Sequence, residues 1–100
     1  MADKIHLSVV SAEGVKLDQM VSYVCIPAEQ GTVGVLANHM PMLCAVKEGF
    51  LNYRFGQDET GSFLVKDGLA SVSANEVSLL VSYAEQASAN EQEGKQEQII

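Results

Sequence analysis

The side chains best suited to chemistry are one histidine and two cysteines in the first half of the chain. His39 precedes Cys44, and Cys25 lies upstream. A thiol beside an imidazole base is the arrangement of a nucleophilic enzyme, and it predicts a thiol that reacts at neutral pH. The segment around His39 supplies no acid to orient the ring. Both cysteines lie among apolar residues without a secretory context, so we predict buried thiols and neither a nucleophile nor a disulfide.

Metal and phosphate chemistry have equally little support. His6 is the only other histidine, and no Cys or carboxylate cluster stands at ligand spacing. Gly31 and Gly34 could cradle a phosphate, but no Lys-Ser or Lys-Thr follows them and Glu29 would repel the anion. We therefore expect no cofactor, no metal and no small-molecule substrate. The remaining carboxylates that we considered are expected to be solvated: Asp58, Glu59, Glu85, Glu91, Glu93 and Glu97.

The segment that contains these glycines, residues 27–43, reads PAEQGTVGVLANHMPML. Its glycines accept a positive φ, and its apolar run is too short for a helix. Asn38 tolerates the left-handed region, and Pro41 favours an extended conformation at Met40. The segment therefore predicts a loop, a short strand, a sharp turn and entry into another strand.

Alternating apolar side chains predict further strands on both sides of this segment. Residues 4–9 alternate, which predicts a half-buried strand with His6 on its outward face. Residues 21–26 are apolar on both faces apart from Ser22, which predicts one central strand that Pro27 stops. Other strands are expected at 15–17, 42–46, 51–55, 63–66, 69–74 and 77–83. The last of them is expected to place Val77, Leu79, Val81 and Tyr83 on one apolar face.

Turn residues separate these strands. Residues 56–61 predict an exposed hairpin loop, and Asn75-Glu76 closes another hairpin. Asp67-Gly68 predicts a short hairpin, because both residues tolerate a positive φ. The pattern indicates an all-β fold, a flattened sandwich or barrel of short antiparallel strands. We assign residues 1–84 to this domain and 85–100 to a polar tail, a frayed helix or a disordered end.

Composition narrows the classes of function. A chain of 100 residues with 47% hydrophobic content allows one domain with a modest core. A net charge of −7 argues against binding to nucleic acid or anionic lipid, because both require a basic patch. No apolar run reaches the roughly 20 residues of a membrane-spanning helix, and the acidic start does not resemble a signal peptide. We expect a cytosolic bacterial protein.

Three motifs resemble the N-terminal β-sandwich domain of the epsilon subunit of F-type rotary ATP synthases, called delta in mitochondria. They are KIHLSVVSAEG at residues 4–14, VSLLVSYAE at residues 77–85 and the glycine-rich segment between them. The last has Gly31, Gly34-Val35-Leu36, His39 and Pro41 where the family reads roughly G-x-x-G-V-L-P-G-H-x-P. Two departures are the Ala37-Asn38 pair in place of Pro-Gly, and Glu48 in place of a proline.

The resemblance implies a non-catalytic rotor subunit of the central stalk. Such a subunit binds the gamma subunit and the ring of c subunits, and it couples proton or sodium flow to ATP synthesis on the cytoplasmic face of the bacterial plasma membrane, as a peripheral protein. The implied gamma-contact residues are Ser11, His39, Met40, Met42 and Cys44. The implied c-ring contacts are Glu29, Gln30, Gly31, Thr32 and Val33. The chain is too short for the family's C-terminal helical hairpin, so we expect a fold without it and transfer no inhibitory or ATP-sensing role.

Other interpretations of these residues stay open. His39 could serve only as a turn residue, the methionines could fill the core, and the loop at residues 29–33 could be solvated. At the level of function, the alternative is a free-standing β-sandwich module that binds a sugar or peptide. Such modules usually expose aromatic side chains on one face, whereas this chain has no Trp.

Overall fold

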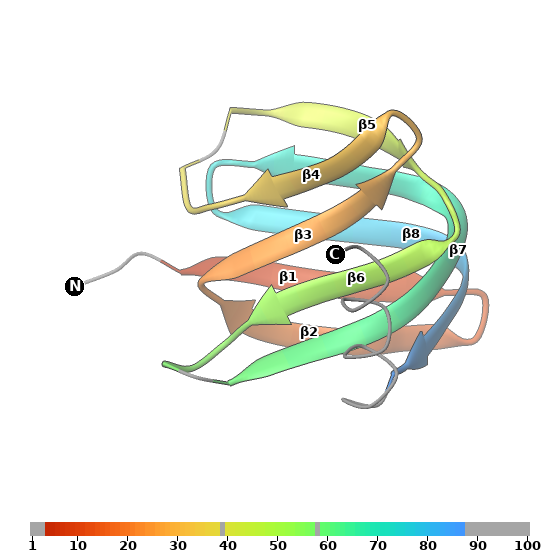
Figure 1. Cartoon of the computed structure of the whole chain (residues 1–100), viewed down its shortest axis with the longest axis horizontal. Helices are drawn as coiled ribbons and strands as arrows, with labels where there is room; N and C mark the ends of the chain where they lie inside the picture. The colour runs from red at the N-terminus through yellow and green to blue at the C-terminus, as the bar shows by residue number, and fades with distance from the viewer. Residues whose placement is uncertain (1–3, 39, 58, 88–100) are drawn as a thin grey trace, which may run out of the picture.

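The computed structural model describes residues 4–38, 40–57 and 59–87, and all regular structure in them is β-strand (Figure 1). The predicted all-β sandwich is confirmed. Its strands are β1 (Ile5–Ser11), β2 (Gly14–Val21), β3 (Tyr23–Ala28), β4 (Gly31–Val35), β5 (Met42–Val46), β6 (Gly49–Arg54), β7 (Thr60–Ser73) and β8 (Glu76–Gln86). Predictions about His39, Asp58 and residues 88–100 lie outside the described residues.

The strands form two layers that face each other across the core. One layer contains β4, β3, β6, the first half of β7, which pairs with β6, and the end of β8. The other contains β5, the second half of β7, the first part of β8, β1 and β2. Figure 1 shows the first layer in front of the second. Most neighbours are antiparallel as predicted, but β1 and β8 are parallel.

The long strands β7 and β8 join the layers by running through both of them. The bend in β7 lies at Asp67, with a φ of 42°, followed by Gly68. A Cβ on Gly68 would lie 2.0 Å from the carbonyl oxygen of Leu80, so only glycine allows this close approach. The predicted hairpin at Asp67-Gly68 is therefore wrong. The positive φ is present, but β8 pairs on both sides of it and keeps the strand continuous.

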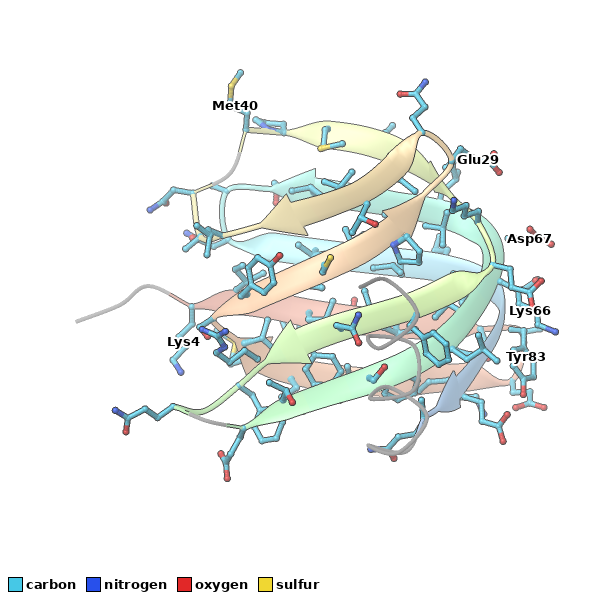
Figure 2. All side chains as sticks on the ribbon, in the orientation of Figure 1. Lys4, Glu29, Met40, Lys66, Asp67 and Tyr83 are labelled. Carbon is cyan, nitrogen blue, oxygen red and sulfur yellow. The ribbon has the colours of Figure 1, made fainter. Side chains whose placement is uncertain are left out.

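The same bend changes which residues of β8 are buried. Val77, Leu79 and Val81 are buried, but the next buried residue is Ala84. Ser82 occupies the position opposite the bend, and its hydroxyl donates a hydrogen bond to the carbonyl of Lys66 at 3.0 Å. Tyr83 consequently points outward, where its ring lies 5.0 Å from the Lys66 ammonium (Figure 2). Its predicted place on the apolar face is wrong.

The predicted central strand at residues 21–26 is corrected in two ways. It is divided at Ser22, because β2 ends at Val21 and β3 begins at Tyr23. Pro27 does not stop β3, which continues to Ala28. The proline is tolerated because β6 pairs with β3 only as far as Cys25 and β5 only at Ala28, so neither strand requires an amide donor from Pro27. Its carbonyl accepts a hydrogen bond from the Lys47 amide.

The core lies between the two layers and takes side chains from both. Residues of β1 alternate between buried and half-buried as predicted, with His6 on the outward face. The fully buried large side chains are Ile5, Leu7, Val9, Val21, Val24, Ile26, Val35, Val46, Leu51, Val65, Val77 and Leu79. This packing fixes the strand register, because a shift by one residue would turn each apolar side chain outward.

Candidate partner-binding surfaces

The predicted c-ring contacts lie in the β3–β4 hairpin, but the predicted loop at residues 29–33 is shorter than expected, because β4 already begins at Gly31. Glu29 and Gln30 lie at its exposed tip, and Gly31 follows with a φ of 130°. The hairpin and β5 border an open groove of about 430 Å³. The residues that line the groove are Ala28, Glu29, Gln30, Gly31, Thr32, Val33, Met42, Leu43, Cys44 and Ala45. The structure thus brings the predicted c-ring contacts together with Met42 and Cys44 of the predicted gamma contacts.

The other predicted gamma contacts occupy different positions. Met40 is 78% exposed and lies at the opposite end of this region from Glu29 (Figure 2). Met42 and Cys44 are half-buried and pack against the core, so the outward residues of β5 are Leu43, which is 72% exposed, and Ala45. Ser11 is buried at the end of β1, where its hydroxyl accepts a hydrogen bond from the Glu13 amide at 3.1 Å.

The turn before residue 39 is held by its backbone. Asn38 adopts a φ of 67°, which confirms the predicted left-handed residue. Its amide donates a hydrogen bond to the carbonyl of Ala74 in the β7–β8 turn at 2.5 Å. This bond ties the chain between β4 and β5 to the opposite layer.

The described residues give no sign that the Cys44 thiol is activated. Cys25 and Cys44 are both free, but each is half-buried and not buried as predicted, and only Cys44 packs against the core. Burial raises the pKa of the Cys44 thiol, which disfavours the reactive thiolate. In the described part of the chain, no three His, Cys, Asp or Glu side chains form a group that could hold a metal ion.

An apolar row that the sequence analysis missed crosses the outer face of the second layer. Register places Ala45 beside Leu69, Leu69 beside Leu80, Leu80 beside Val10 and Val10 beside Val15. We call these five residues the apolar row. Leu69, Leu80 and Val15 are each more than half exposed. Such a contiguous exposed apolar surface is typical of a protein interface.

A charged cluster stands on the same face, at the other end of β1. The Nε2 atom of His6 lies 2.5 Å from a carboxylate oxygen of Asp18, and its Nδ1 atom lies 3.6 Å from Glu76. The hydrogen bond to Asp18 and the charges of both carboxylates raise the pKa of His6. The imidazolium form therefore links β1 to both of its neighbours, β2 and β8.

Solved structures and curated relatives resemble this chain closely. A chain in the cryo-EM structure of the Euglena gracilis mitochondrial ATP synthase, OSCP/F1/c-ring, superposes with a TM-score of 0.80 at 20% identity, over 95% of this chain and 62% of that one. A chain in the Tetrahymena thermophila mitochondrial ATP synthase central stalk/c-ring structure gives 0.68 at 16% identity, over 84% and 67%. Both likenesses show the fold. The described residues form no helix that is long and apolar enough to cross a membrane.

Curated relatives carry the family assignment. The ATP synthase epsilon chain of Syntrophobacter fumaroxidans is 39% identical, and that of Nitratidesulfovibrio vulgaris (strain Miyazaki F) is 38% identical, each over 87% of this chain. The chain spans less than two thirds of these relatives, 64% of each. The profile of the family described as "ATP synthase, Delta/Epsilon chain, beta-sandwich domain" matches residues 4–87. The predicted resemblance is confirmed, and the chain belongs to this family of ATP synthase delta/epsilon β-sandwich domains.

Proposed function

We propose that this domain is a non-catalytic part of the rotor of a bacterial ATP synthase. One surface binds the gamma subunit, and the hairpin tip at Glu29 and Gln30 contacts the c-ring. The complex lies on the cytoplasmic face of the plasma membrane, where the domain transmits torque from ion flow to the shaft. Membership of the delta/epsilon family supports this assignment, as do the bacterial epsilon chains among its relatives.

The apolar row is the observation that carries the proposal at the level of residues. Leu69 and Leu80 expose more than half of their surface although they lie in the middle of regular strands. A partner that covers this face would remove apolar area from water at about 25 cal/mol per Å². We assign the row to the gamma interface, beside the predicted contact Met40 and the exposed Leu43. This assignment adds residues that sequence reasoning did not find.

The hairpin suits a smaller contact with the ring. Glu29 carries the only charge at the tip, beside the amide of Gln30. With one charge and one amide, the tip is better suited to a few hydrogen bonds with polar loops of the c-ring than to an extended network of ion pairs.

In the test, the chain is mixed with the gamma subunit, and the molecular mass of the eluted protein or complex is measured. We expect a stoichiometric complex with the unchanged chain. Leu80→Lys should weaken gamma binding by at least about tenfold, because a charged group would be buried at the interface. Gln57→Lys, in the loop between β6 and β7, is the control and should bind normally. Equal binding by Leu80→Lys, with its fold intact, would remove the row from the interface, and failure of the unchanged chain to bind would refute the proposed function.

A further inference from the structure

Strand β4 has a partner strand on one side only. Among the described residues it pairs with β3, from Val24↔Val35 to Ala28↔Gly31, and with no other strand. The second edge of β4 therefore carries main-chain groups that no strand satisfies. It borders the groove between the β3–β4 hairpin and β5.

Hydrogen bonds on β3 identify which residues of β4 face this free edge. The Pro27 carbonyl accepts a bond from the Lys47 amide, and the Glu29 amide donates to the Ala45 carbonyl, so these positions face β5. Because direction alternates along a strand, the intervening Ala28 faces β4 and its partner there is Gly31. Continuing the alternation, Thr32 and Gly34 direct their amides and carbonyls to the free edge.

The two edge strands of the sheet, β2 and β4, differ in how well they are protected against pairing with another strand. Strand β2 ends the sheet on the other side; it carries the charges of Lys16 and Asp18, and its register with β1 shifts at Lys16, between the pairs Val9↔Leu17 and Val10↔Val15. Charges and bulges are the usual means of preventing edge-to-edge pairing. Strand β4 reads GTVGV, with no charge and no proline. Its edge is open to another strand.

Exposed apolar side chains surround this edge. Leu36, directly after β4, is 63% exposed, Leu43 of β5, which lines the groove, is 72% exposed, and Met40, two residues before β5, is 78% exposed. An added strand would place alternate side chains against these three residues. The surroundings thus fit an extended segment with apolar side chains at every second position, and Glu29 is the one charged residue among those that line the groove.

We propose that β4 receives an extended segment of the gamma subunit as an additional β-strand. This inference rests on the proposed function and identifies how the partner binds. Main-chain hydrogen bonds to Thr32 and Gly34 supply the attachment, and Leu36, Met40 and Leu43 contact the side chains of the added strand. The hairpin tip at Glu29 and Gln30 stays outside this contact, whereas Thr32, an implied c-ring contact, becomes a gamma contact.

The test is amide hydrogen exchange of the whole chain, free and bound to gamma. In the complex we expect exchange at Thr32 and Gly34 to slow by more than about 100-fold. Val33 already pairs with Ile26 and serves as the internal reference. A complex in which Thr32 and Gly34 exchange as in the free chain would overturn strand addition and leave the proposed function intact. Absence of any complex would overturn both.

A proline variant provides a second measurement. Thr32→Pro removes the amide at a free-edge position, where proline is compatible with a strand. Losing one main-chain hydrogen bond should weaken gamma binding about fivefold to tenfold. Gln57→Pro, in an exposed bend outside both surfaces, controls for the effect of proline itself. Unchanged affinity of a folded Thr32→Pro chain would contradict the inference.

Discussion

At the scale of the residue, the charges around His6 make the stability of the fold depend on pH. Its ring stands between Asp18 and Glu76, and the hydrogen bond to Asp18 is the main cause of its raised pKa. A group whose pKa is higher in the folded state stabilises the fold fully below its unfolded value of about 6.5, and this contribution is lost as the pH rises through the raised pKa.

We therefore expect the free energy of unfolding to fall as the pH rises above about 6.5 and through the raised pKa, where His6 loses its proton. His6→Gln should show less of this dependence, since its amide does not titrate. Urea unfolding across the pH range measures the effect, and NMR titration of the imidazole of His6, assigned with a His39→Gln chain, measures the pKa itself. Asp18→Asn should lower that pKa. A pKa that Asp18→Asn leaves unchanged would show that the ion pair is not its cause.

At the scale of the element, the bend of β7 depends on a single absent methyl group. In Gly68→Ala the new Cβ would meet the Leu80 carbonyl and the Cα of Val81, both main-chain atoms that cannot rotate away. We expect the free energy of unfolding to fall by about 3 kcal/mol. Denaturant unfolding checks this, with Ser71→Ala on the same strand as the control, expected within about 0.5 kcal/mol of the parent. A Gly68→Ala chain as stable as the control would show that the two strands can separate at little cost.

This bend also marks where sequence reasoning succeeds and where it stops. Alternation identified β1, and the tolerance of Asn38 for the left-handed region was read correctly, because both are local properties. The positive φ at Asp67 was also anticipated, but whether such a residue closes a hairpin or bends a strand depends on the distant β8. Pro27 was misread for the same reason, since its tolerance depends on where β5 and β6 begin and end.

The partner surfaces were predictable in part. The glycine-rich segment revealed the hairpin, because its turn chemistry is written in consecutive residues. The apolar row was not found, because Leu69 and Leu80 become neighbours only through the register of β7 with β8. Each of them alone looks like an ordinary strand leucine. The functional meaning of either surface remains a proposal that the binding experiments decide.

At the scale of the whole molecule, a domain that transmits torque has to resist shear between its layers. Strands β7 and β8 pair with each other in both layers, so neither layer can open without breaking their shared ladder. Leu7 in one layer and Leu51 in the other are both fully buried in the same core. The two layers should therefore unfold as one cooperative unit.

We expect Leu7→Ala and Leu51→Ala each to lower the free energy of unfolding by about 3 kcal/mol, because each leaves a cavity in the core. Amide exchange under native conditions then distinguishes one unit from two. In either variant, protection should fall by the same factor at Val9 in β1 and at Ile26 in β3, since opening the core exposes both layers together. If Leu7→Ala lowered protection in β1 and left Ile26 unaffected, the layers would open independently. A shell of that kind would yield under load at the β7–β8 bend, and the proposed role as a rigid coupling between ring and shaft would have to be abandoned.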